Sequence, residues 1–572
     1  MQRHQPLCQI CMRTKHFFTK VVFHWHPARL LPIISGLAAG AMLFVAIQSK
    51  AATTLSACGT LAQAGETYTL SQDLTTTGTC LIVTAGNVTI NLNGHTITYG
   101  SGGANQMYGV RTGWANNGLR VTNGTIRQSQ TAGSFSHAIY VSSGSYDQFD
   151  NLTLEVYTDS SAPLVALYGT GHQVHHNSVI SHVQTIQDRH QNQGYSIQLW
   201  DGGSNDVHDN TIVGGPQGGI FFYHSNNTRV YDNDISQGGQ SIGYSNDFCI
   251  GGSGDNAEVF RNNCHPVQGR GMHIGGNGAK AYDNTINVIE LPNNAEYGGC
   301  QAGGTYGIQI EHPATNLQIY NNTVIARADA CAAQAFRASG LYASNGNRVY
   351  SNSFTAQRVG AGTGVANAVS LASVDTGLTI ESNTLSGDSA NFHVDWEGSN
   401  GTLLKNNVIV KGSNPSSIYA TVNFGNGSSF SSLGNILQDS TYQNGADDAS
   451  YRVRTAGFEY TVQWTLSITS TDTHGTPIGN ASVTITDSTG ATAFTGTTNA
   501  SGVTSAVLRE YRRYNQSGTN YVQSFNPYTV TVSKAGYGTS VSSVTVDQAK
   551  SISPQLTGDA TPPAGVTDLR AQ

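Results

Sequence analysis

A short repeat, in which an apolar residue stands three positions before an asparagine, constrains the fold of this chain more than any other feature. The asparagines of the repeat are Asn177, Asn210, Asn233, Asn262, Asn284, Asn322, Asn352, Asn383 and Asn407. Successive members lie 33, 23, 29, 22, 38, 30, 31 and 24 residues apart. A spacing with a floor near 22 and a variable excess is typical of a solenoid, in which a coil of fixed length carries loop insertions on one side.

Asparagine suits the corner of such a coil. It tolerates the left-handed backbone conformation that a tight turn needs, and its amide can bond to the coils above and below. The repeat therefore predicts a ladder of stacked asparagines that runs along the solenoid.

A second pattern, four residues long, recurs before most of these asparagines. The tetrapeptides are Ile197–Trp200, Ile220–Tyr223, Phe248–Gly251, Met272–Gly275, Ile308–Glu311, Leu341–Ser344, Val369–Ala372 and Phe392–Asp395. In all of them the first and third positions are apolar, whereas the second and fourth are mixed and often polar. This alternation indicates strands with one face in the core and one face exposed. We therefore predict an all-β fold, a parallel β-helix.

The repeat resembles the right-handed parallel β-helix proteins of the pectate-lyase-like superfamily. The resemblance covers residues 55–445, and Asn87–Ile97 is similar to the opening coil of those proteins. It implies a right-handed β-helix, but a fold of this kind does not define an activity.

One segment resembles the polygalacturonases more narrowly. In that family Asp-Asp-Cys precedes Gly-His-Gly-x-x-Ile-Gly, and this chain has Asn246–Gly251 followed by Gly269–Gly275. The likeness also implies a Cys249–Cys264 disulfide. Phe248 replaces the second aspartate and Arg270 replaces the histidine, so we do not expect polygalacturonase activity.

The pattern changes towards the C-terminus. Residues 461–556 resemble a carboxypeptidase-regulatory or prealbumin-like β-sandwich. We expect the β-helix over 52–445, a linker over 446–460, and a linker or the start of a truncated fibronectin type III module over 557–572.

The N-terminal residues predict export. The first 50 residues contain six Lys and Arg and no Asp or Glu, and the apolar run Leu30–Ile47 precedes the small residues Ser49 and Ala51. This pattern is typical of a secretory signal over 1–51, with an uncleaved membrane anchor as the alternative. After cleavage we expect no stable membrane span, and a protein that is secreted, periplasmic or on the cell surface.

Removal of the signal takes away six positive charges and changes the net charge from −7 to −13. A chain this acidic is a poor partner for nucleic acid.

The cysteines that remain are Cys58, Cys80, Cys249, Cys264, Cys300 and Cys331. Their even number in an exported chain suggests disulfides. Their order along the chain suggests the pairs Cys58–Cys80, Cys249–Cys264 and Cys300–Cys331. No CxxC pair remains, so we expect no metal site.

The outward positions of the tetrapeptides predict a groove. Stacked coils lie about 4.8 Å apart, so these positions form rows, with Trp200 and Tyr223 at one end of a row and Glu311 three coils further on. The residues expected to bind substrate are Trp200, Asp201, Tyr223, His224, Arg270 and His312. Each also has a purely structural interpretation, as cover for the sheet or as a hydrogen-bonded surface group.

The candidate catalytic residues are Asp247, His273 and Glu311. A glycoside hydrolase needs one protonated carboxyl group and one ionised partner. Asp247 and Glu311 are two coils apart, about 10 Å by the coil spacing, which is slightly long for an inverting pair.

These observations favour a secreted protein that acts on a polysaccharide or cell-surface glycan, first of all as a glycoside hydrolase without a cofactor and as a monomer. One alternative is a non-catalytic surface or adhesive protein that only binds glycan. The other is a polysaccharide lyase or epimerase, for which calcium would be a natural cofactor. The absence of lysine between residues 52 and 279 disfavours a lyase that uses a lysine base in this groove.

Overall fold

The computed structural model describes residues 52–113, 116–158, 160–183, 195–215, 218–237, 248–290, 305–341, 346–360, 362–375, 377–395, 398–426, 431–454, 457–516 and 518–559. Residues 51–572 form one compact unit. The expected signal, residues 1–51, lies outside the described residues. In the described part of the chain the regular elements are all strands, and none of it forms a helix that could cross a membrane.

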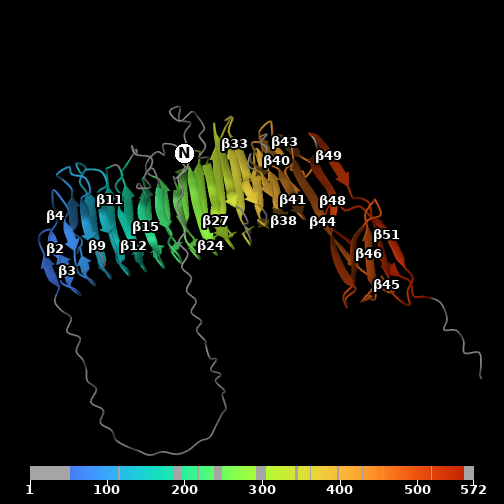
Figure 1. Ribbon diagram of the computed structural model, residues 1–572, viewed down its shortest axis with the longest axis horizontal. Coiled ribbons are helices and arrows are strands. Elements are labelled where there is room, and N and C mark those ends of the chain that lie inside the picture. The colour runs from blue at the N-terminus through green and yellow to red at the C-terminus, as the bar shows by residue number, and fades with distance from the viewer. Residues whose placement is uncertain are drawn as a thin grey trace, which may run out of the picture. The chain divides into compact units, whose positions relative to one another are not determined.

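One long parallel sheet, sheet B, presents its outer face along the β-helix (Figure 1). Its strands are β2 (Gly59–Leu61), β5 (Leu81–Val83), β8 (Tyr108–Thr112), β10 (His137–Val141), β12 (Leu164–Thr170), β15 (Tyr195–Gly203), β18 (Gly218–Tyr223), β21 (Phe248–Ser253), β24 (Arg270–Asn277), β27 (Thr305–Thr315), β30 (Ala332–Leu341), β33 (Val365–Asp375), β36 (Ala390–Val394), β37 (Ser399–Asn400), β40 (Ala420–Asn426) and β43 (Tyr451–Arg454).

The other long sheet, sheet A, bends at a corner and so contains two rows of strands. The row before the corner contains β1 (Thr53–Leu55), β3 (Thr67–Leu70), β6 (Thr89–Asn91), β13 (Gln173–His175), β16 (Asp206–His208), β19 (Arg229–Tyr231), β22 (Glu258–Phe260), β25 (Lys280–Tyr282), β28 (Gln318–Tyr320), β31 (Arg348–Tyr350), β34 (Thr379–Glu381), β38 (Leu403–Lys405), β41 (Ser432–Gln438) and β44 (Phe458–Thr469).

The row after the corner contains β4 (Leu74–Thr75), β7 (Thr96–Tyr99), β14 (Ser178–Ser181), β17 (Thr211–Gly214), β20 (Asp234–Gln237), β23 (Asn263–Gln268), β26 (Thr285–Ile289), β29 (Thr323–Ala328), β32 (Ser353–Arg358), β35 (Thr384–Gly387), β39 (Val408–Lys411) and β42 (Thr441–Gln443). Two strands, β9 (Arg120–Gln128) and β11 (Gln148–Val156), run through the corner and belong to both rows.

Each coil therefore passes through sheet B and then through both rows of sheet A. One coil contains β15, β16 and β17, and the next contains β18, β19 and β20, with each strand paired in parallel to its successor. This arrangement confirms the predicted all-β parallel β-helix.

The interior is filled by the apolar positions of both patterns. Ile197, Met272 and Ile308 are fully buried on sheet B, and Val207 and Val259 are fully buried on sheet A. Branched and long apolar side chains thus stack from coil to coil in one continuous core, as the alternation predicted.

The register of two tetrapeptides differs from the prediction. Ile250, rather than Phe248, pairs with Ile220 and Met272, and Phe336, rather than Leu341, pairs with Ile308. Strict alternation fails because two consecutive residues face the interior near the start of these strands.

The same pair of consecutive inward residues occurs in β24 and β27, and its first residue is small there as it is in β21 and β30. An added Cβ at Gly271 would lie 2.2 Å from Ile286, and one at Gly307 would lie 2.2 Å from Val324, although the next residue in each strand is also buried. The residue before the pair therefore faces outward. Phe248 holds that position in β21 and packs with other aromatic rings on the outer face of sheet B.

The predicted asparagine ladder is present and buried. The side-chain amide of Asn210 donates to the Oδ1 of Asn233 at 2.9 Å and to the carbonyl of Val174 at 2.8 Å. Its own Oδ1 accepts the backbone N–H of Asn177 at 3.1 Å. The same contacts recur up to Asn407, so each coil is bonded to the next through a satisfied polar network.

The left-handed residue of each corner precedes the ladder asparagine, which differs from our expectation for asparagine itself. Positive φ angles occur at His176, Asp209, Asp232, Arg261, Asp283, Asn321, Ser351, Ser382 and Asn406. The ladder asparagine is instead selected by the hydrogen bonds of its amide.

Residues 446–460, which we expected to be a linker, contain β43 and the start of β44. The first half of β44 pairs with β41 of the β-helix and its second half pairs with β52. The long strand β48 pairs with β44 from Glu459 to Thr469. The C-terminal strands are β45 (Thr471–Asp472), β46 (Ser482–Thr486), β47 (Thr492–Thr497), β48 (Val503–Gln516), β49 (Thr519–Ser524), β50 (Tyr528–Ser533), β51 (Ser540–Val544), β52 (Lys550–Ile552) and β53 (Gln555–Leu556).

Two of the predicted disulfides are formed. Cys58 and Cys80 join successive coils near the N-terminal end, and Cys249 in β21 joins Cys264 in β23. The predicted Cys300–Cys331 bond stays a prediction, because Cys300 lies outside the described residues.

Candidate functional site

A cavity of about 460 Å³ opens on the outer face of sheet B over β8, β10, β12 and β15. We call it the aromatic pocket. Its lining residues are Gln106, Tyr108, Arg111, Phe135, His137, Tyr140, Val165, Leu167, Gln198 and Trp200. A pocket of this size with a largely aromatic lining and a few polar groups is typical of small-molecule or oligomer binding sites.

Three rings form one wall of the aromatic pocket. The ring centroids of Tyr108 and Tyr140 are 4.9 Å apart, and that of His137 lies 5.9 Å from Tyr108 and 5.7 Å from Tyr140. The guanidinium of Arg111 lies 5.4 Å from the Tyr108 ring centroid. The register brings these residues together, because Tyr108 pairs with His137 and Arg111 pairs with Tyr140.

Trp200 lines the pocket from β15. Its indole N–H donates to the Oε1 of Gln198 at 3.3 Å, and the amide of Gln198 donates to the carbonyl of Tyr195 at 3.2 Å. The indole also packs against Phe221 and Tyr223, with ring centroids 5.0 and 5.7 Å away. These contacts hold the indole in place before any ligand arrives, which reduces the entropy cost of binding.

Two titratable groups of the pocket, His137 and Tyr108, are held neutral. Burial lowers the pKa of His137 to about 4. The Nδ1 of the ring accepts a hydrogen bond from the backbone N–H of Ala162 at 2.9 Å. The proton of the neutral ring therefore resides on Nε2, which is a donor. Burial, followed by the effect of Tyr140, raises the pKa of Tyr108, so its hydroxyl stays protonated.

The structure brings four of the predicted binding residues together beside the pocket. Trp200 and Tyr223 stand on adjacent strands, and Asp201 accepts a contact from the Nδ1 of His224 at 3.1 Å. This pair is exposed, and Tyr223 is 38% exposed. The predicted row is thus real at its N-terminal end.

Arg270 and His273 lie further along the same face, on β24. The guanidinium of Arg270 is buried between two rings, 5.2 Å from the centroid of Phe248 and 5.0 Å from that of Tyr306. The ring of His273 stacks on Phe248 at 5.1 Å. Packing against aromatic rings thus orients both polar groups on the outer face.

A further charged pair follows on the same face. Arg337 in β30 contacts Asp395 at 3.2 Å, and its guanidinium lies 4.9 Å from the Tyr306 ring. We call the outer face of sheet B from β8 to β24 its aromatic half. The face beyond β24, which carries Arg337 and Asp395, is its charged half.

The other predicted site residues are not placed by the structure. Asp247 lies outside the described residues, as do the side chains of Glu311 and His312. The backbone of Glu311 belongs to β27, where it pairs with Ser339. The proposed pairing of Asp247 with Glu311 stays a prediction.

Sequence reasoning missed most of the aromatic pocket. Tyr108, Arg111, His137 and Tyr140 lie in coils that precede the first recognised tetrapeptide. Their segments alternate in the same way, with buried Val110 before Arg111 and buried Ile139 before Tyr140. That alternation was the available signal.

No family model matches the chain, and no curated protein matches it. Among solved structures it is similar to a DFA-IIIase from Arthrobacter chlorophenolicus A6 in complex with GF2, with 14% identity, a TM-score of 0.40, and coverage of 56% of this chain and 83% of that one. It is also similar to the tailspike protein of E. coli bacteriophage HK620 in complex with a pentasaccharide, with 12% identity, a TM-score of 0.38, and coverage of 84% and 87%.

A third similar structure is the A-module of the mannuronan C-5 epimerase AlgE6 from Azotobacter vinelandii, with 13% identity, a TM-score of 0.28, and coverage of 69% of this chain and 90% of that one. At these low TM-scores no statement about function follows from the likeness.

Proposed function

We propose that this protein is exported and binds a polysaccharide on the outer face of sheet B, with the aromatic pocket as its main binding site. The observation that carries the proposal is the composition of the pocket: a cavity of about 460 Å³ is lined by the aromatic rings of Tyr108, Phe135, Tyr140 and Trp200 together with the hydrogen-bonding side chains of Gln106, His137 and Gln198.

This composition suits sugars because a sugar ring has apolar C–H faces and a rim of hydroxyl groups. Aromatic rings bury apolar surface at fixed geometry, and the rim can bond to Gln106, to the Tyr140 hydroxyl and to the Nε2 of His137. Arg111 adds one cation that could bond to an acidic substituent. The net charge changes from −7 to −13 when the signal with its six basic residues is removed. This charge works against strongly anionic polymers at long range, so we expect a neutral or weakly acidic glycan.

An extracellular location fits the disulfides Cys58–Cys80 and Cys249–Cys264, because such bonds persist in oxidising compartments. The basic and apolar N-terminal segment supports the same proposal.

Binding is favoured over hydrolysis within the pocket itself. Among the described residues that line it none is Asp or Glu, whereas a glycoside hydrolase uses a pair of carboxyl groups. Hydrolysis is a second candidate only for the charged half of the face. That half begins at β27, the strand that carries Glu311, our expected acid. It borders β24, where the ring of His273 stacks on Phe248.

A polysaccharide panel tests the proposal. The exported chain is immobilised, and retention of each glycan is compared for wild type, Trp200→Ala and Tyr140→Ala. We expect each variant to lose at least about tenfold in affinity, roughly 1.4 kcal/mol. Tyr521→Ala is the control, because Tyr521 is an exposed tyrosine of the C-terminal sheet, and it should bind as wild type does.

Affinity that is unchanged in both pocket variants would show that the glycan binds elsewhere. Products are measured in the same samples. New reducing ends that disappear in Glu311→Gln would assign hydrolysis to the charged half, and retention without products assigns binding alone.

A further inference from the structure

A ladder of aromatic rings runs along the outside of sheet A, on the strands before the corner. The rings belong to His175, His208, Tyr231, Phe260, Tyr282, Tyr320 and Tyr350. Successive centroids are 4.6–5.0 Å apart and the planes differ by no more than 12°. Tyrosine or phenylalanine fills the later positions, and histidine fills the first two.

The corner residues that follow these histidines are also unusual. His176 follows His175, and Asp209 follows His208, and both corner residues have positive φ angles. Two adjacent coils therefore present His-His and His-Asp at equivalent positions, 33 residues apart in the sequence.

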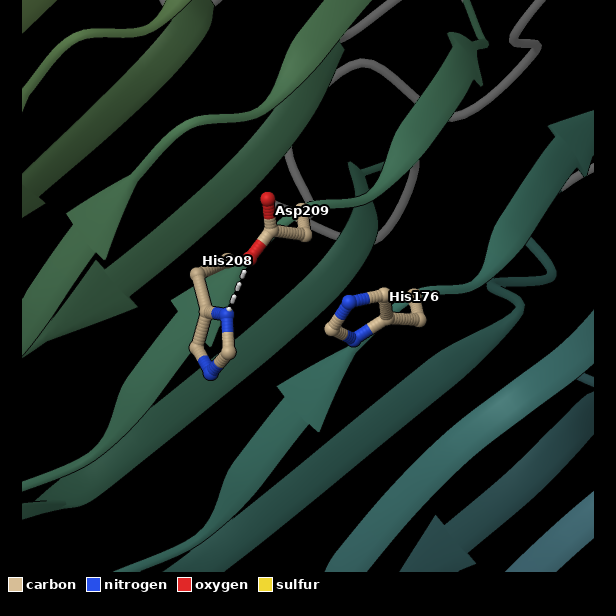
Figure 2. A group of neighbouring side chains, drawn as sticks. All are labelled: His176, His208 and Asp209. Atoms are coloured by element: carbon tan, nitrogen blue, oxygen red, sulfur yellow. Dashed lines mark hydrogen bonds and ion pairs between the residues drawn. The ribbon is translucent and has the colours of Figure 1, made fainter.

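The side chains of His176, His208 and Asp209 converge. Figure 2 shows the ring of His176 facing the pair formed by His208 and Asp209, in which Nδ1 lies 2.8 Å from Oδ2. One ligand atom from each residue lies within 4.8 Å of the other two. The Nδ1 of His175 contacts the Nδ1 of His176 at 2.9 Å, which orients the His176 ring and leaves its Nε2 for a ligand.

We propose that His176, His208 and Asp209 form a binding site for a divalent transition-metal ion of the Zn²⁺, Cu²⁺ or Ni²⁺ class. Two imidazoles and one carboxylate are ligands that these ions prefer, whereas Ca²⁺ and Mg²⁺ prefer oxygen. Metal–ligand bonds of about 2.0–2.1 Å place neighbouring ligand atoms roughly 3.4 Å apart. The exposed ring of His176 can supply the small movement that this requires.

The neighbouring corner shows how a carboxylate at this position is paired when no histidine faces it. Asp232, one coil further on, is paired with Arg261 at 2.6 Å, so an arginine compensates the carboxylate there. At Asp209 the facing groups are imidazoles. The ion would join two successive coils near the start of the aromatic ladder, on a sheet other than the one that carries the aromatic pocket.

Zinc titration of the untagged chain, freed of metal by a chelator that is then removed, tests the proposal. The variants use residues that the chain itself has at equivalent positions: His176→Asn and Asp209→Asn, because Asn321 and Asn406 hold the same corner, and His208→Tyr, because Tyr231 holds the same ladder position. Wild type should bind one equivalent of Zn²⁺ more than each variant, or bind it at least tenfold more tightly.

His265→Gln is the matched control. His265 contacts Asp234 at 2.6 Å on sheet A and is outside the three-residue cluster, so this variant should keep the wild-type stoichiometry and affinity. Zn²⁺ should also raise the unfolding midpoint of wild type and of the control, and raise it less in the three variants.

Equal stoichiometry and affinity in wild type and in all three variants would overturn the site. Displacement of Zn²⁺ by equimolar Ca²⁺ or Mg²⁺ would overturn the ligand class. If a variant failed to fold, the visible absorption of the Co²⁺-loaded wild-type chain would decide, because a spectrum of fully hydrated Co²⁺ would also overturn the proposal.

Discussion

The two outer surfaces of the β-helix use the same residue types for different ends. On sheet A the rings of the ladder are nearly parallel and cover one another's faces, as in Phe260 and Tyr282 with an interplanar angle of 0°. On sheet B the interplanar angles around the aromatic pocket vary, from 13° between His137 and Tyr140 to 31° between Tyr108 and Tyr140 and 58° between Trp200 and Phe221. Where the rings repeat regularly from coil to coil, as on sheet A, they cover one another. Where their orientations vary, as on sheet B, ring faces stay uncovered and line a cavity that can hold a ligand.

The comparison predicts that changes along the corner of sheet A alter stability, and that changes in the aromatic pocket alter binding. The largest expected effect is that of Asn284→Ala. Asn284 is buried and its amide bonds to Asn322 and to two backbone carbonyls, and its Oδ1 accepts from Asn262. Loss of these bonds leaves buried polar groups without hydrogen-bond partners, so we expect a destabilisation of about 2–4 kcal/mol.

Chemical denaturation of residues 52–572 measures this loss, with Asn520→Ala, a change at an exposed asparagine of β49, as the control. A midpoint equal to that of wild type in Asn284→Ala would mean that the ladder does not stabilise the coils.

The aromatic pocket should make stability depend on pH through His137. The folded protein keeps this ring neutral down to about pH 4, whereas the unfolded chain protonates it near pH 6.5. Between these values the unfolded state binds more protons, so the free energy of unfolding falls as the pH is lowered, by about 2–3 kcal/mol from this residue. His137→Gln should show a smaller decrease between pH 7 and pH 4, and His265→Gln should follow wild type. Parallel curves for His137→Gln and wild type would contradict the buried neutral imidazole.

The inward glycines of sheet B allow the preceding side chains to face outward. Gly271→Ala would bring a methyl group within 2.2 Å of Ile286, and we expect it to cost about 1–3 kcal/mol. Gly59→Ala is the control, because an added Cβ there meets nothing within 4 Å. Thermal unfolding of both variants measures this cost, and equal midpoints would contradict the close packing of Gly271 against Ile286.

The smallest expected change in stability, that of Tyr320→Ala, separates the role of the sheet A ladder from that of the aromatic pocket. Tyr320 stacks between Tyr282 and Tyr350 at 4.8 and 5.0 Å, so Tyr320→Ala should destabilise the protein by about 1–2 kcal/mol and leave polysaccharide affinity unchanged. Tyr320→Phe keeps the ring, as at Phe260, and should restore the midpoint. A loss of affinity in Tyr320→Ala would mean that sheet A also binds glycan.

Much of the fold could be predicted because its rules are local. The asparagine repeat and the alternation of apolar residues report the coil directly, and the spacing of Cys58 and Cys80 agrees with one coil. Phe248 was misplaced because period-2 alternation does not reveal two consecutive inward residues, Cys249 and Ile250. The asparagine repeat is absent from the coils of β9 and β11, because these strands run through the corner, where Asn123 and Asn151 take the positive φ themselves and no ladder asparagine follows.

The sites were harder to predict because they depend on register between coils. His176 and Asp209 are 33 residues apart, and only the pairing of β13 with β16 brings them together. We had expected no metal site because the cysteine spacing lacks a CxxC pair, and histidines distributed over two coils leave no such local signature.

The central claim is that glycan binds in the aromatic pocket. A crystal structure of residues 52–572 with an oligosaccharide of the best-retained polysaccharide tests it most directly. We expect a sugar ring between Trp200 and the rings of Tyr108 and Tyr140, with a hydroxyl group bonded to the Nε2 of His137. A sugar bound on sheet A or on the C-terminal sheets, with the aromatic pocket empty, would contradict the claim.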